Sequence, residues 1–165
     1  MFRLRAMPNP TRTDFEIAAR SLDLIRTLDP TDTDLLRRSI EAWAAAGDPD
    51  TEVARTRELL ALDPNDTIAQ LRLAIEGLSR AQTADERLDA YTRLLGDRGR
   101  ALDPAVRSRL AVDAALLARD NSDDALSLEY LTLATTLDPT NKEAAALYAG
   151  NLLQLTSDPF DRVDL

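Results

Sequence analysis

The tripeptide Leu-Asp-Pro occurs four times in this 165-residue chain, and its spacing restricts the fold more than any other feature. The prolines are Pro30, Pro64, Pro104 and Pro139, so successive copies lie 34, 40 and 35 residues apart. Proline lacks a backbone donor and pushes the preceding residue out of the helical region, so each copy is a stop signal for a helix. Helix ends that recur at this period predict stacked helical hairpins.

The composition favours helices over sheets. Hydrophobic residues make up 44% of the chain and aromatic residues only 4%, and alanine and leucine supply most of the apolar content. These residues suit closely packed helices. At this length the chain can form one domain with a core of its own.

The charge distribution separates a short tail from the rest of the chain. The net charge is −9 and the pI about 4.5, which argues against nucleic acid as a partner because the phosphates would repel the chain. Residues 1–12 carry Arg3, Arg5 and Arg12 but no acidic residue, so they are interpreted as a basic tail that is either solvated or touches an acidic surface. The repeat domain is expected over residues 13–165, as part of a longer repeat array.

The absence of cysteine and histidine bears on chemistry and location. Without them the chain lacks the thiol nucleophile, the commonest general base and the commonest zinc ligand, so no enzyme activity, cofactor or metal site is expected. The oxygen-rich segment 120–124 lacks the glycine and spacing of a calcium loop and is interpreted as helix capping. No signal peptide or membrane span is predicted, and we expect a cytoplasmic protein. Lys142 is the only lysine, which is typical of GC-rich bacterial coding.

Apolar periodicity and capping signals predict the individual helices. Asp32 or Thr33, and Asn65 or Asp66, are candidate N-caps, and Thr83 with Glu86 forms a capping box. A further helix is expected to open at residues 157–159. The main helices are expected over residues 13–28, 32–46, 50–62, 65–81, 83–95, 104–120, 122–137 and 141–156.

The pattern resembles the tetratricopeptide repeat (TPR), a pair of antiparallel helices in 34 residues. The resemblance is carried by the Leu-Asp-Pro elements, the turn Gly47-Asp48, the large residue Trp43 and two matching second-helix patterns. Those patterns are Ala18, Leu22, Ile25, Leu28 and Ser127, Leu131, Ala134, Leu137. Gly77 and the 40-residue repeat depart from the family pattern. The resemblance implies an all-α, right-handed solenoid with about 3.5 repeats, acting as a non-catalytic protein–protein interaction scaffold or adaptor.

The resemblance also implies that the first helix of each hairpin lines a concave groove for a peptide or helix of a partner protein. An apolar strip with an acidic rim would suit a basic or amphipathic segment. A clamp for a C-terminal carboxylate is not supported, because only Arg37 and Asn151 could contribute and they lie two or more repeats apart. The expected groove residues are Arg37, Ile68, Leu71, Ile75, Ala111, Ala115, Leu147 and Asn151.

Two alternatives remain open at this point. Ile68, Leu71, Ile75 and Leu78 also have the spacing of an ordinary core stripe, so they are either binding surface or core. The groove or the ends could instead be filled by another copy or by the rest of the same chain. The protein would then be a structural or self-assembly module, and a homo-oligomer is possible.

Overall fold

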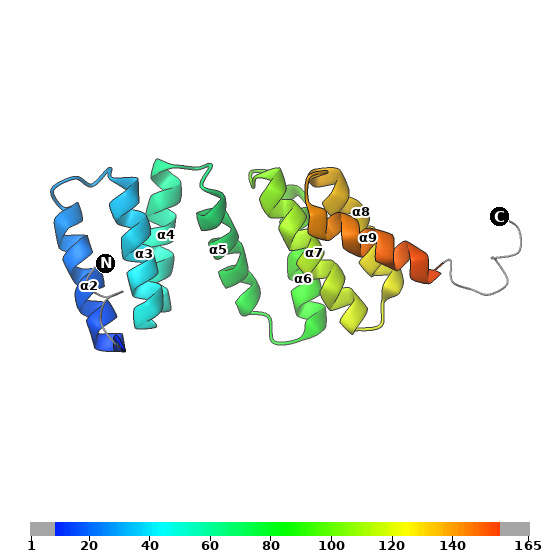
Figure 1. The fold of residues 1–165 in the computed structure, drawn as a ribbon, viewed down its shortest axis with the longest axis horizontal. Coiled ribbons are helices and arrows are strands. Elements are labelled where there is room, and N and C mark those ends of the chain that lie inside the picture. Colours follow the sequence, from blue (N-terminus) through cyan, green and yellow to red (C-terminus); the bar gives the residue numbers. More distant parts are fainter. Residues whose placement is uncertain (1–8, 156–165) are drawn as a thin grey trace, which may run out of the picture. The chain divides into compact units, whose positions relative to one another are not determined.

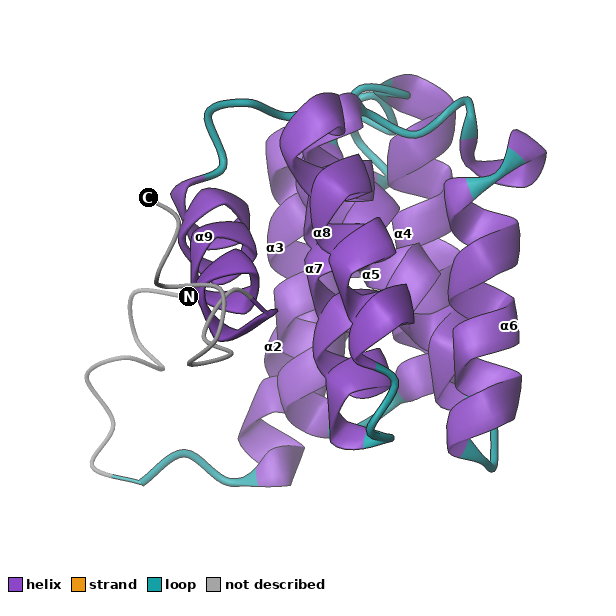
Figure 2. Ribbon diagram, turned by 90° about the vertical axis from the view of Figure 1, so that its right-hand side faces the viewer, coloured by secondary structure: helices purple, strands orange, loops and turns teal. Residues whose placement is uncertain are grey.

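The computed structural model describes residues 9–155, which fold into eight α-helices and one short 3-10 helix, η1 (Figures 1 and 2). No strand occurs in this described part of the chain. The expectations for residues 1–8 and for a helix opening at 157–159 lie outside it. The elements are α2 (Arg12–Arg26), α3 (Thr33–Ala46), α4 (Pro49–Leu62), α5 (Thr67–Ser79), α6 (Ala84–Leu95), η1 (Asp97–Gly99), α7 (Pro104–Asp120), α8 (Asp124–Leu137) and α9 (Lys142–Leu155).

The chain divides into two compact units, Met1–Glu76 and Gly77–Leu165, and the boundary falls in the last turn of α5. In the first unit, α3 packs against both α2 and α4. In the second unit, α7 packs against α6 and α8, and α9 packs against α8 and α7. Short turns reverse the chain between successive helices of each unit (Figure 1). The all-α class and the repeated helical hairpins of the expected solenoid are therefore confirmed.

The Leu-Asp-Pro turns are built on hydrogen bonds of their aspartates. In all four copies the carboxylate accepts the backbone N–H two residues further along the chain. Such a bond fixes a tight turn, because the side chain takes the place of a backbone acceptor. The pairs are Asp29 with Thr31 (3.1 Å), Asp63 with Asn65 (3.3 Å), Asp103 with Ala105 (2.8 Å) and Asp138 with Thr140 (2.9 Å).

Three of these turns end in a second capping side chain. Asp32, Asp66 and Asn141 each accept a backbone N–H of the helix that follows, over 2.8 to 3.1 Å. These bonds satisfy donors that the first turn of a helix otherwise leaves unpaired. Of the alternative caps expected from the sequence, the structure thus selects Asp32 and Asp66.

The third Leu-Asp-Pro copy begins a helix without directly ending one, in agreement with the helices expected over residues 83–95 and 104–120. Helix α6 already ends at Leu95, and η1 and a turn separate it from Asp103. Asp103 caps α7 directly, and Pro104 is the first helical residue, where its missing N–H costs nothing. This copy therefore only begins a helix. Helix α2, in contrast, ends earlier than expected, at Arg26.

Gly99 lets η1 pack closely on the end of α6. The residue is buried, and a Cβ atom added to it would lie 1.5 Å from the carbonyl oxygen of Leu94 and 2.7 Å from its carbonyl carbon. Backbone atoms cannot move aside as the end of a flexible side chain can. The longer spacing of this repeat therefore depends on a glycine at position 99.

We expect Gly99→Ala to lower the free energy of unfolding by about 2 kcal/mol, because the added methyl overpacks against backbone. Urea unfolding followed by far-UV circular dichroism measures the change. The matched control is Gly150→Ala in α9, where an added Cβ meets nothing within 4 Å. Alanine should stabilise that helix by about 0.5 kcal/mol. Equal stabilities for the two variants would contradict the close packing of η1.

A carboxylate joins three helices of the first unit. Asp23 of α2 accepts hydrogen bonds from Ser39 Oγ (2.6 Å) and Trp43 Nε1 (3.2 Å) of α3 and from Arg55 Nη2 (2.8 Å) of α4. Partial burial opposes ionisation, but the hydrogen bonds from Ser39, Arg55 and Trp43 outweigh it and lower the pKa of Asp23. The ionised carboxylate therefore stabilises the packing of α2, α3 and α4.

We expect Asp23→Asn to cost about 2 kcal/mol of unfolding free energy at neutral pH, because the donors around it lose a charged acceptor. The folded-state pKa of Asp23 lies below its unfolded value, near 3.9. Its contribution is thus present above about pH 4 and is lost as the pH falls through the folded pKa. Urea unfolding at a series of pH values should show the variant and the parent converging under acid conditions. Asp89→Asn, at an exposed position of α6, is the control and should leave the profile unchanged.

Candidate functional site

The first unit contains a groove between α3 and α5 with α4 at its floor, which we call groove 1. Its cavity measures about 60 Å³. The side chains of Ile40, Leu59 and Ala69 form an almost fully buried apolar floor, whereas Ile68 at the edge is 70% exposed. The lining residues are Arg37, Ile40, Glu41, Thr56, Leu59, Asp66, Ile68, Ala69 and Arg72.

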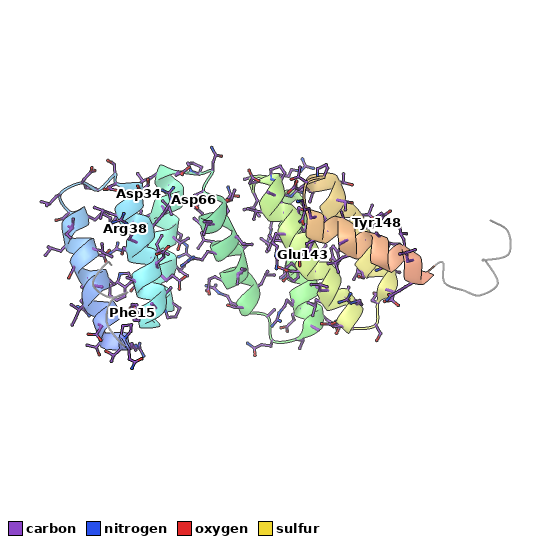
Figure 3. All side chains as sticks on the ribbon, in the orientation of Figure 1. Phe15, Asp34, Arg38, Asp66, Glu143 and Tyr148 are labelled. Atoms are coloured by element: carbon purple, nitrogen blue, oxygen red, sulfur yellow. The ribbon has the colours of Figure 1, made fainter. Side chains whose placement is uncertain are left out.

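Arg37 is held at the end of groove 1 by three aspartates. Its Nε donates to Asp66 (2.8 Å), its Nη2 to Asp63 (3.0 Å) and its Nη1 to Asp34 (3.0 Å). The hydrogen bond that Arg37 donates to Asp66 is the main cause that raises the pKa of Arg37. Figure 3 shows Asp34 and Asp66 at the same end of their helices. The guanidinium thus ties α3 to the turn before α5.

The polar rim of groove 1 is acidic. Three carboxylates share the single charge of Arg37, and the nearby Arg72 is paired with Glu52 (2.7 Å). Glu41 is exposed and makes no ion pair with any residue between 9 and 155. Arg37 is therefore already neutralised and does not offer its charge to a carboxylate ligand. Cationic groups are the ones that this rim attracts.

We expect Arg37→Gln to lower the free energy of unfolding by about 1 kcal/mol, because Asp34, Asp63 and Asp66 would then face one another without a counter-charge. The loss should shrink in high salt, which screens the repulsion. Urea unfolding at low and high salt measures it. Arg38→Gln is the control, because Arg38 is exposed and does not line the groove. A loss of equal size in both variants would show that the network does not contribute.

The second unit contains a similar groove between α7 and α9 with α8 at its floor, which we call groove 2. Its cavity measures about 120 Å³. Asn151 Nδ2 lies 3.5 Å from Ser127 Oγ across it, and Arg119 makes no ion pair with any described residue. The lining residues are Ala115, Leu116, Arg119, Ser127, Leu131, Ala146, Leu147, Gly150, Asn151 and Gln154.

Polar contacts also fix α9 against α7. Asn141 Nδ2, at the cap of α9, donates to Ser108 Oγ (2.9 Å), and Ser108 in turn donates to the carbonyl oxygen of Ala134 (2.8 Å). Arg109 of α7 pairs with Glu143 of α9 at 2.6 Å. Both units therefore connect the first helix of one hairpin to the cap of the next, through Arg37 in the first unit and through Ser108 in the second.

The groove residues predicted from the sequence differ in how much of each side chain is exposed to solvent. Ile68 and Ile75 are exposed, at 70% and 51%, and Arg37, Leu71, Leu147 and Asn151 are half-buried. Of the four residues that could instead form an ordinary core stripe, namely Ile68, Leu71, Ile75 and Leu78, only Leu78 is buried. For the exposed and half-buried residues, contact with a partner stays a prediction.

Ala111 and Ala115 differ from the other predicted groove residues, because their side chains are buried at 0% and 1% exposure. Helix α7 packs against α6, α8 and α9, and its small side chains allow those helices to approach closely. Ala115 lines the floor of groove 2, whereas Ala111 does not line either groove. Ala111 therefore presents no side-chain surface to a partner.

Sequence reasoning missed the groove residues Arg72 and Arg119. Arg119 follows Ala115 by four positions, so helical spacing could have placed it on the same face. Arg72 could have been found in the same way, because it follows Ile68 by four positions. The pairing of Arg37 with Asp63 and Asp66 has no such local signal.

Within residues 9–155, no three metal-binding side chains cluster in a way that could hold an ion. None of the helices in that range combines the length and apolar character needed to cross a membrane.

Comparisons with known proteins give limited information. No family model matches the chain, and no curated protein matches it. Among solved structures, a crystal structure of MamA is similar with a TM-score of 0.47 and 14% sequence identity, over 92% of this chain and 86% of that chain. A likeness of this degree says nothing about function.

Proposed function

We propose that the protein is a non-catalytic scaffold, each of whose two grooves binds a segment of another protein. In the first unit, Arg37, Ile68, Leu71 and Ile75 would surround the bound segment. In the second unit, Leu147 and Asn151 would do so over the floor that includes Ala115.

The chemistry of groove 1 carries the proposal. Ile40 and Leu59 form a floor that is closed to solvent, and Ile68 stands exposed at its edge. An aliphatic or aromatic side chain placed there would cover Ile68 and gain about 25 cal/mol for each Å² of apolar surface removed from water.

The acidic rim sets the preferred charge of the occupant. Asp34, Asp63 and Asp66 outnumber the one guanidinium between them, and Glu41 adds a further carboxylate. A segment that carries arginine or lysine beside its apolar side chain would complement this rim. The charge would speed the encounter and select the partner more than it would tighten the complex.

A selection of random peptides displayed on phage tests this function directly. We expect the peptides recovered through groove 1 to place an aliphatic or aromatic side chain within two residues of arginine or lysine. Ile68→Glu should weaken the selected peptides by at least about tenfold, because it puts a carboxylate where the apolar contact forms. Fluorescence anisotropy of a labelled peptide measures this affinity.

The control is Ile17→Glu, since Ile17 is 59% exposed on α2 and lies outside groove 1. It should keep the parent affinity, and both variants should keep the parent far-UV spectrum because both positions are exposed. Binding of acidic peptides to groove 1, or equal losses for the two variants, would contradict the proposal.

A further inference from the structure

Small residues leave open space in groove 2. Ala115 of α7 lies at its floor, and Ala146 and Gly150, four positions apart on α9, line the same cavity. A Cβ atom added at Gly150 would meet nothing within 4 Å. The cavity of about 120 Å³ is several times the roughly 30 Å³ that a water molecule occupies in the liquid, so it can admit a side chain from a partner.

The polar side chains around this space offer hydrogen-bond donors. The guanidinium of Arg119 is exposed and makes no ion pair with any described residue. Asn151 Nδ2 lies 3.5 Å from Ser127 Oγ, which is longer than the usual N–H···O distance of about 2.9 Å. The amide of Asn151 is therefore free to exchange this weak contact for a stronger acceptor. Gln154 supplies a second amide.

The charge of groove 2 is the opposite of that of groove 1. Although the chain contains 29 acidic residues, none is among the described residues that line groove 2. Asp120 and Asp123 lie near Arg119 in the sequence, but neither lines the groove. Asp123 is engaged as the cap of α8, where it accepts the backbone N–H of Leu126 (3.0 Å). The lining of groove 2 thus presents a cation and donors without a carboxylate.

We propose that groove 2 binds an acidic segment of a partner protein, whose aspartate or glutamate side chain enters the cavity and pairs with Arg119. This inference rests on the proposed function, because it names the chemistry of the segment that groove 2 would hold. The carboxylate would accept hydrogen bonds from Arg119 and Asn151, and such bonds are strong because donor or acceptor is charged. Apolar neighbours of the acidic residue would contact Leu116 and Leu147, which also line the groove.

Selection of random peptides on the Ile68→Glu chain tests this proposal with groove 1 impaired. The peptides are displayed as N-terminal fusions on phage, so they carry no free carboxyl terminus. We expect enrichment of aspartate or glutamate beside an aliphatic residue. The net charge of −9 repels such peptides from most of the surface, so their retention would indicate a local basic site. Recovery of basic or uncharged peptides alone would overturn the proposal.

Charge reversal at Arg119 identifies the pairing group. A selected acidic peptide, synthesised with blocked termini, should bind Arg119→Glu at least about tenfold more weakly than the parent, because repulsion replaces charge-assisted hydrogen bonds. The matched control is Arg98→Glu, an exposed position of the same unit that lines neither groove. Fluorescence anisotropy measures both affinities. Equal losses for the two variants, or binding only by a peptide with a free carboxyl terminus, would contradict the pairing.

A charge swap gives a second readout of the same contact. A peptide in which lysine replaces the acidic residue should bind the parent weakly and the Arg119→Glu chain at least about tenfold better. A merely structural role of Arg119 would not restore binding in this way. The affinity of the original acidic peptide should also fall as the salt concentration rises.

Filling the cavity tests whether the carboxylate enters it. Gly150→Leu should weaken the acidic peptide at least about tenfold, because the new side chain occupies the open space. The control is Gly77→Leu in α5, where an added Cβ also meets nothing within 4 Å but which lines neither groove. Both variants should keep the far-UV spectrum of the parent, because leucine favours helix over glycine. Undiminished binding by Gly150→Leu would show that the cavity is not the site.

The two grooves can fail independently in these measurements. If basic, apolar peptides bind the parent through groove 1 but no acidic peptide depends on Arg119, the present inference is wrong while the scaffold function of groove 1 stands. If neither class of peptide binds the parent chain, the proposed function itself is wrong.

Discussion

The hydrogen bond that an aspartate side chain accepts from a backbone N–H of its own turn is the interaction on which the described structure depends. It recurs at Asp29, Asp63, Asp103 and Asp138, and in each case it shapes the entry to the next helix. Helix ends carry unsatisfied backbone groups, so a hairpin repeat needs such a device at every junction. The carboxylate supplies the acceptor locally, and the hairpins can therefore stack without long loops.

The same carboxylates determine the character of groove 1. Asp63 and Asp66 complete the turn before α5, and both also bind Arg37 of α3. The bond to Arg37 and the backbone N–H of Ala69 lower the pKa of Asp66 against the effect of its partial burial. A feature that terminates and caps helices thus also positions a guanidinium and leaves the groove rim negative. In this chain the acidic turns serve the fold and set the polarity of the binding surface together.

Most helices could be predicted because their signals are local. Helix α7 has the expected bounds, and the capping box at Thr83 is present. The third Leu-Asp-Pro copy begins α7 as predicted, because the motif is compatible with both ends of a helix and Gly96 already marks the end of α6. The groove was harder to predict. Burial of Ala111 depends on how closely the neighbouring helices approach α7. The distance between packed helices cannot be predicted from helical spacing in the sequence alone.

The two grooves are formed by the same arrangement of helices but are lined by chemically different side chains. The specificity of each groove for a bound segment therefore depends on a few lining residues. In the first unit a guanidinium links the helices, and the charges around it are negative in excess. In the second unit a serine and an asparagine make the corresponding link, and the cation Arg119 lines the groove without an ion-pair partner among the described residues. Because the same hairpin architecture carries both, the fold fixes where a segment can lie and the lining residues fix its charge. Substitution of lining residues could therefore change the preferred partner of one groove while leaving the buried floor, and hence the packing of that unit, intact.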